Sequence, residues 1–358
     1  MPQYIVKLKT EESLKRCCLT LRQKKIKFAP LKSINSIVYK AKDIGEAIEL
    51  LEHEHPLRLD EDILVSLRNH TPFLPAEAKG TLLPWNMKRI GATRSRIPKK
   101  FSRPRVAIFS TGVSPHPHLP PPGPGINLSN EPGMADHHGL GTHTAGIICA
   151  YSPQKGKLKF HGIFPRLPLG HVKVFNKGGI TSISRLIRGL EWCMQKNVNL
   201  AVFPFTLLQH HPAFYEAVKA AHRQGIIMVA PCGDDGSLGV NYPARYREVL
   251  AVGSTNEEDQ ISSFSQAGTD LDLVAPGEAI LSTGKSGRWA MGSGSALACA
   301  HVAGCLALAL SLNPELTLGE IRSLLQRSCE PLPASPLLQG YGLLSLNGLL
   351  SHLLSGQI

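Results

Sequence analysis

Apolar and polar positions alternate differently in the two halves of the chain. Over the first 65 residues, short apolar runs at 4–8 and 37–40 predict strands, and residues 11–24 and 43–53 carry apolar side chains at helical spacing. The order strand, helix, strand, helix, strand predicts a small α+β unit. The stretch at 69–83, marked by Pro and Gly, predicts a linker.

Beyond residue 105, short apolar runs alternate with amphipathic helical segments. The runs lie at 106–109, 169–175, 200–205, 226–231 and 249–252, and the helical segments lie at 182–197 and 212–224. This alternation predicts an α/β fold with a mostly parallel sheet and helices on both faces. We therefore divide the chain into an α+β domain at 1–68, the linker, and a larger domain at 84–358.

Composition excludes several classes of protein. The 358 residues are 42% hydrophobic and 18% charged, which excludes a disordered or fibrous chain. The longest apolar run, 296–312, is shorter than the ~20 residues of a membrane span and contains His301, so we expect no span. The first ten residues lack the apolar stretch of a secretory signal, and the eight cysteines are too sparse for a disulfide scaffold. We expect a cytoplasmic protein with free thiols.

The net charge of +12 is concentrated near the N-terminus. Up to Arg105 there are 22 basic and 11 acidic residues, and residues 79–105 hold nine basic residues and no acidic one. This run fits either an acidic partner or a solvated connecting segment. Nucleic acid is not expected, because Trp85 and Phe101 are the two aromatics available for stacking in the run.

Three glycine-bearing segments follow one another in the larger domain. Residues 106–119 form an apolar run that ends in a Thr-Gly turn, residues 139–146 read GLGTHTAG, and residues 294–304 read GSALACAHVAG. In this order they resemble the subtilisin family of serine peptidases, and the resemblance extends over essentially the whole chain. It implies a subtilisin-like sheet with helices on both faces, preceded by a propeptide-like domain that acts as chaperone and inhibitor.

The resemblance also implies four positions for the chemistry of peptide hydrolysis. The family uses a serine nucleophile, a histidine base, a buried aspartate and an oxyanion-binding asparagine. Here the histidine is His143, but Ser110 stands at the aspartate position, Ala296 at the serine position and Asp234 at the asparagine position. Because alanine has no nucleophilic atom, we expect a pseudoprotease that is not an enzyme and acts by binding, as a regulator or scaffold.

An alternative stays open at this point. Ser293 and Ser295 flank the degenerate position, and either could serve as a relocated nucleophile in an active serine endopeptidase. Inactive subtilisin relatives serve in spore-germination signalling, which suggests, by analogy, a spore-associated role or one in a proteolytic pathway.

The resemblance further places a peptide cleft along Pro204, Phe205 and Thr206. We expect a peptide or protein partner there, with the chain's own propeptide-like domain filling the cleft. Pro204 lacks an N–H, so strand pairing at that edge loses a donor. No metal or cofactor is expected. In the family's main calcium site a carboxylate follows His-Pro, where this chain has Pro117-His118-Leu119, and the loop at 151–159 is basic.

Overall fold

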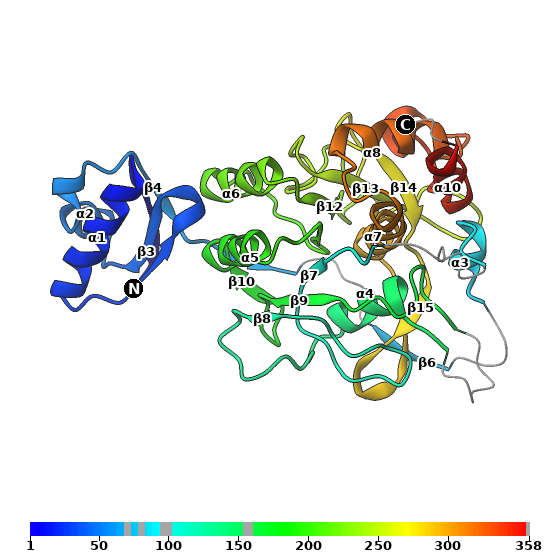
Figure 1. Ribbon diagram of the computed structural model, residues 1–358, viewed down its shortest axis with the longest axis horizontal. Coiled ribbons are helices and arrows are strands. Elements are labelled where there is room, and N and C mark those ends of the chain that lie inside the picture. The colour runs from blue at the N-terminus through cyan, green and yellow to red at the C-terminus, as the bar shows by residue number, and fades with distance from the viewer. Residues whose placement is uncertain (68–72, 78–82, 94–101, 153–159, 356–358) are drawn as a thin grey trace.

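The computed structural model describes residues 1–67, 73–77, 83–93, 102–152 and 160–355. Figure 1 shows a small lobe at residues 3–61 and a large lobe at residues 83–355. The predicted α/β fold with a small N-terminal unit is confirmed. The domain boundaries predicted near 68 and 83 adjoin the undescribed segments 68–72 and 78–82 and stay predictions.

The small lobe is an antiparallel sheet with two helices. Its strands are β1 (Gln3–Lys7), β2 (Phe28–Leu31), β3 (Ser36–Lys40) and β4 (Arg58–Glu61), in the order β2-β3-β1-β4. Its helices are α1 (Glu11–Gln23), α2 (Ile44–Glu49) and the short 3₁₀ turns η1 (Lys32–Ile34) and η2 (Glu52–Glu54). The α-helices begin where the side chains of Thr10 and Asp43 accept backbone N–H groups. Strand β2 was not predicted, because Pro30 interrupts its apolar run.

The large lobe is built on seven strands. They are β7 (Val106–Ser110), β8 (Ile126–Asn127), β9 (Gly170–Lys173), β11 (Leu200–Val202), β12 (Ile227–Pro231), β13 (Leu250–Thr255) and β14 (Leu273–Pro276). Their order is β14-β13-β12-β11-β7-β9-β8, and every neighbouring pair is parallel.

Helices cover both faces of this sheet. One face packs on α4 (Leu140–Cys149) and α7 (Ser295–Leu312), and the other packs on α5 (Ile183–Gln195) and α6 (Pro212–Arg223). Alternation along β7 separates the two cores, since Ile108 packs on the α7 side and Phe109 on the α5 side. Helices α5 and α6 lie between the sheet and the small lobe (Figure 1), where Ile5 and Val38 join their apolar core.

Helix α7 is apolar around its whole circumference. In the described part of the chain it is the helix long and apolar enough to cross a membrane, and 94% of it is buried inside the protein. That burial is the setting of a core helix. All eight cysteines are unpaired thiols; seven are buried and Cys18 is half-buried.

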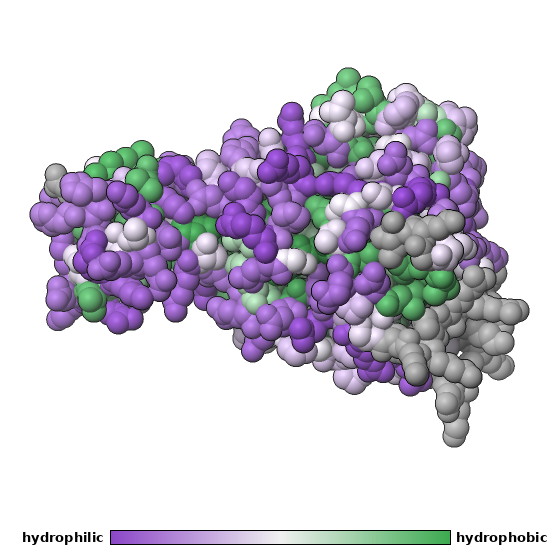
Figure 2. Space-filling model, turned by 45° about the horizontal axis from the view of Figure 1, so that its top comes forward, coloured by the Kyte–Doolittle hydropathy of each residue, from purple (hydrophilic) through white to green (hydrophobic). Residues whose placement is uncertain are grey.

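Two small sheets attach the segment between the two lobes to the large lobe. Strand β5 (Leu64–Ser66) pairs with β10 (Ile180–Ser182), and β6 (Leu74–Ala76) pairs with the hairpin of β15 (Ile280–Thr283) and β16 (Trp289–Gly292). The remaining elements are α3 (Trp85–Arg89), η3 (Lys285–Gly287), α8 (Leu318–Ser328), α9 (Pro336–Gln339) and α10 (Leu346–Leu354). Figure 2 shows a mostly hydrophilic surface on which apolar residues are scattered.

Candidate active site

Ser110, at the position the resemblance gives to aspartate, ends β7 and is fully buried. Its hydroxyl is used locally, because Oγ lies 3.3 Å from both the backbone N and the backbone O of Gly112. The first turn of α4 packs directly on this turn: a Cβ on Gly141 would lie 2.0 Å from the Gly112 oxygen and 2.6 Å from Ser110 Oγ. Glycine at 141 is therefore required for the close approach.

A carboxylate that the sequence analysis missed organises the same corner. Asp136 is buried, and its Oδ1 accepts hydrogen bonds from Thr111 Oγ1 at 2.8 Å and from the backbone N of Gly139 at 2.7 Å. Its Oδ2 accepts from the backbone N and Oγ1 of Thr142 at 2.9 and 2.7 Å. Asp136 thus satisfies the free N–H groups at the start of α4. An aspartate three residues before a glycine turn was the available signal.

His143 lies inside the protein rather than at an open surface. Its Nε2 is 3.1 Å from the backbone oxygen of Ile280 and 3.2 Å from that of Ala290, so this nitrogen carries the proton and donates to the β15–β16 hairpin. Burial lowers the pKa of His143 to about 4, so the ring is neutral at pH 7. Within the described part of the chain, the His143 ring bonds to these two backbone oxygens and not to Ser110, Ala296 or Asp234. Its assignment as catalytic base stays a prediction that these bonds do not support.

The start of α7 brings other predicted residues together. Ala296 is buried, and the backbone N of the preceding Ser295 donates to Asp234 Oδ1 at 2.7 Å. Burial raises the pKa of Asp234 to about 6, although the hydrogen bonds from Ser295 favour the charged form and partly oppose this shift. The side chain of Ser295 is fully buried in the same place, and its hydroxyl interacts with the Asp234 carboxyl group. By contrast, Ser293 Oγ accepts the backbone N–H of Ala279 at 2.9 Å.

Of the three predicted cleft residues, one lines a pocket. Phe205 is buried, with ring centroids 5.6 Å from Phe203 and 5.4 Å from Phe175, and Pro204 is buried beside it. The side chains of Pro204 and Phe205 therefore lie in the core, and the peptide cleft expected along them stays a prediction. Thr206 begins the edge of a pocket of about 180 Å³ that lies between residues 206–209 and residues 63–66.

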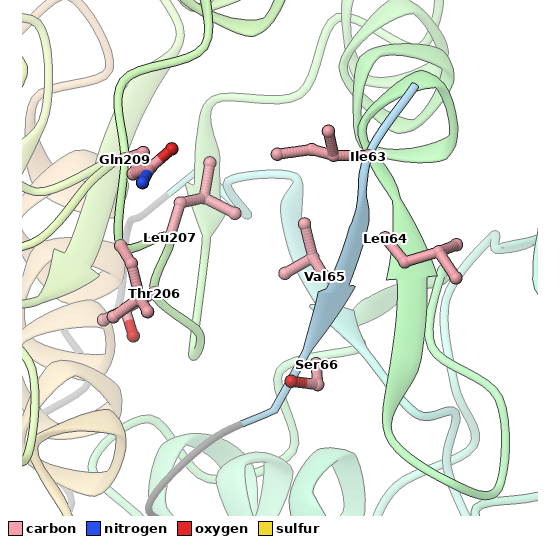
Figure 3. Close-up of a pocket in the computed structure, with 8 residues that line it drawn as sticks. Ile63, Leu64, Val65, Ser66, Thr206, Leu207 and Gln209 are labelled. Carbon is pink, nitrogen blue, oxygen red and sulfur yellow. The ribbon is translucent and has the colours of Figure 1, made fainter. Parts of the chain in front are cut away.

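Strand β5 forms the opposite side of this pocket (Figure 3). It pairs antiparallel with β10, with Leu64 opposite Ser182 and Ser66 opposite Ile180. Val65 points toward the pocket and is buried, whereas Leu64 points away and is 73% exposed. The side chain of Asp62 holds the start of this strand, because it accepts the backbone N of Ser184 at 2.7 Å and its Oγ at 2.6 Å.

The expected absence of a calcium site stays a prediction. The ring of His118 bonds the backbone oxygen of Tyr151 at 3.0 Å, but residues 153–159 of the predicted basic loop lie outside the described residues. Among the residues that are described, no group of three His, Cys, Asp or Glu side chains could hold a metal ion. Five of the nine basic residues in the run at 79–105 also fall in the undescribed segments 78–82 and 94–101.

The sequence of this chain is similar to a family model and to several known proteins. The model described as "Subtilase family" matches residues 105–342. The "Thermostable alkaline protease" of Halalkalibacterium halodurans is 34% identical over 262 residues, which cover 73% of this chain and 72% of that protein. "Subtilisin Savinase" of Lederbergia lenta is 34% identical over 264 residues, covering 74% of this chain and 97% of that protein.

These findings contradict one expectation from the sequence. We expected a chain that is not an enzyme, because three of the four catalytic positions carry the wrong group. The matched family is a family of peptidases, and the relatives at 34% identity carry the names of proteases and subtilisins. The expectation of an inactive protein is therefore wrong on this comparison, and the site has to be considered as that of an enzyme.

Proposed function

Because this chain belongs to the subtilase family, we propose that it is a serine endopeptidase whose nucleophile is the hydroxyl of Ser295. The observation that carries the proposal is the position of Ser295 beside Asp234 at the start of α7, where the backbone N–H of Ser295 donates to Asp234 Oδ1 and its side chain interacts with the same carboxyl group. A serine next to a carboxyl group that is poised to accept a proton is the minimal unit of nucleophilic catalysis. The family's own serine position cannot act, since Ala296 has no nucleophilic atom.

Asp234 is better matched to the role of general base than His143. A base works best when its pKa lies near the working pH, and the pKa of Asp234 is about 6 whereas that of His143 is about 4. The neutral His143 is also committed to two backbone oxygens. We assign it the structural task of joining α4 to the β15–β16 hairpin.

The proposed reaction proceeds in two balanced halves. The proton of Ser295 Oγ passes to the Asp234 carboxylate while Oγ bonds to the peptide carbonyl carbon, and the electron pair of the C=O double bond moves to the carbonyl oxygen. The C–N bond then breaks, and the leaving amine takes the proton from Asp234. Water next attacks the resulting ester with Asp234 again as base, which releases the acid and restores the Ser295 hydroxyl.

The N-terminal part of the chain fits the role of an inhibitor in this proposal. Strand β5 lies against β10 as an extended peptide would, and pairing through backbone groups tolerates many sequences. The small lobe is held on the helical face by ion pairs from Glu216 to Lys7 at 2.6 Å and to Arg58 at 2.8 Å. We propose residues 1–68 as the inhibitory domain and 84–358 as the peptidase domain.

The test is covalent labelling of the full chain. A fluorophosphonate probe should label Ser295, located by mass spectrometry, and hydrolysis of an internally quenched peptide library should fall to background in Ser295→Ala. Asp234→Asn should lower hydrolysis roughly 10²–10⁴-fold, the usual contribution of a general base. The matched control is Ser293→Ala, which should retain activity because Ser293 Oγ is committed to Ala279. Absence of labelling at Ser295, or hydrolysis that survives Ser295→Ala, would overturn the proposal.

A further inference from the structure

A pocket of about 290 Å³ lies at the amino ends of two central strands of the large sheet. Val106, the first residue of β7, and Gly170, the first residue of β9, form part of its lining, together with Trp192 from α5. Ser295 and Asp234 lie at the other edge, since Asp234 follows the carboxyl end of β12 and bonds to Ser295. Because all strands of this sheet are parallel, the length of a strand separates the pocket from the candidate active site.

The walls of the pocket are apolar and rigid. Prolines supply three of the lining residues, Pro104, Pro124 and Pro168, and each proline ring restricts its own backbone. Leu167 and Val198 are buried and add further apolar surface. A pocket with such walls is formed before a ligand arrives, so binding orders little of the chain. The lining therefore favours a ligand whose body is a hydrocarbon.

Positive charge gathers around these apolar walls. Arg103, Arg105 and Lys196 line the pocket, and no Asp or Glu of the described residues lines it with them. Arg105 Nε donates to the backbone oxygen of Asn197 at 2.7 Å, which holds the plane of the guanidinium. The two Nη groups of a guanidinium form a fork that suits a carboxylate. Apolar walls beside these cations concentrate their field, so the pocket also favours an anionic head group.

We propose that this pocket binds a medium-chain fatty acid, with its hydrocarbon chain against Trp192 and its carboxylate on Arg103 and Arg105. A chain of about eight to ten carbons matches the cavity, because a methylene group takes up about as much space as a water molecule, about 30 Å³. An inorganic anion would use the cations alone, and an uncharged hydrocarbon would use the walls alone. This site goes beyond the proposed peptidase function, since neither Ser295 nor Asp234 lines it.

The test is calorimetric titration of the full chain with saturated fatty acids of six, eight and ten carbons, each below the concentration at which it forms micelles. We expect one molecule bound per chain and an affinity that rises about fourfold with each added CH₂ group. Decanol, which keeps the chain and lacks the charge, should bind at least tenfold more weakly than decanoate. Absence of saturable decanoate binding, equal affinity for the six- and ten-carbon acids, or equal affinity for decanol and decanoate would overturn the proposal.

The substitution Arg105→Gln tests the charged side of the pocket. The Arg105 side chain is exposed, and the bonds of its backbone N and O to Asn199 do not involve the guanidinium, so the fold should be kept. Its affinity for decanoate should fall at least fivefold. The matched control is Arg223→Gln, which removes an exposed cation at the end of α6 that does not line the pocket, and its affinity should be unchanged. Equal losses in the two variants would show a general attraction of a basic protein for anions and would overturn the proposal.

Tryptophan fluorescence locates the bound ligand. Trp192 lines this pocket, whereas the other two tryptophans, Trp85 and Trp289, line different ones. Decanoate should change the tryptophan emission of the wild type, and this change should be lost in Trp192→Phe while calorimetry still detects binding. A change that persists in Trp192→Phe would place the ligand elsewhere and overturn the proposal. Ser295→Ala should bind decanoate as the wild type does, so failure of this site and failure of the proposed peptidase are distinguishable.

Discussion

Replacing Asp234 by asparagine isolates the cost of a buried carboxylate at the start of α7. The substitution keeps the size of the side chain and an oxygen that accepts the backbone N–H of Ser295, but it removes the ionisation. In the folded protein, burial raises the pKa of Asp234 to about 6. In the unfolded chain the same group titrates near its ordinary value of about 3.9.

The difference of about two pKa units corresponds to about 3 kcal/mol at 1.36 kcal/mol per unit. Because the folded pKa is raised, the native state holds this proton more tightly than the unfolded state. The resulting stabilisation is fully present below about pH 4 and is lost as the pH rises through about 6. The wild type should therefore lose about 3 kcal/mol relative to Asp234→Asn between pH 4 and pH 7, and the difference should then stay constant.

The assay is urea unfolding of both proteins at intervals between pH 4 and pH 8, followed by tryptophan fluorescence. The neighbouring Asp235→Asn serves as control, because hydrogen bonds from Ser237 lower the pKa of Asp235 and its pH dependence has the opposite sign. A stability difference between wild type and Asp234→Asn that does not change with pH would refute the reasoning. So would an asparagine variant that is less stable relative to wild type at pH 8 than at pH 4.

Three further outcomes are expected. Asp136→Asn should lower stability by about 2–4 kcal/mol, because an amide cannot accept the donors that both carboxylate oxygens now serve; calorimetry measures this, and an unchanged melting temperature would contradict the role assigned to Asp136. Asp62→Ala should speed proteolytic cleavage within residues 62–67 at least tenfold by freeing β5, whereas Asp60→Asn, which removes an ion pair with Arg58, should not. If Asp234 is the base, kcat/KM for a peptide should rise tenfold per pH unit and level off above about pH 6; a profile centred near pH 4 would point to His143 instead.

The period of the apolar positions was enough to predict the large sheet. Strands β7, β9, β11, β12 and β13 fall where continuous apolar runs stand, because a strand buried on both faces needs apolar residues at every position. The half-buried β2 was missed because its pattern is short and broken by Pro30. The pattern of apolar residues therefore predicts an element best when the element is buried, because burial restricts which residue types each position can hold.

The site was predicted in part, for a different physical reason. Motif spacing placed Ala296 where a helix opens and Asp234 in the loop after the apolar run at 226–230, and the structure brings this loop to the start of α7. It could not give the direction in which the His143 side chain points, because its ring bonds to backbone oxygens of a hairpin about 140 residues further along the chain. Nor could it show that β6 pairs with that hairpin, because three residues that include a proline look like a linker until their partner strand is known.

The buried, unpaired thiols of the large lobe affect how readily the protein reacts with oxidants and alkylating agents. Burial raises the pKa of Cys232 and of Cys329 to about 12, which leaves roughly 10³-fold less thiolate than an ordinary cysteine holds at neutral pH. Since oxidants and alkylating agents react with the thiolate, these sulfur atoms are protected for as long as the fold stays closed. Each opening of the core makes them reactive again, so the rate at which they are alkylated measures how often the native protein opens.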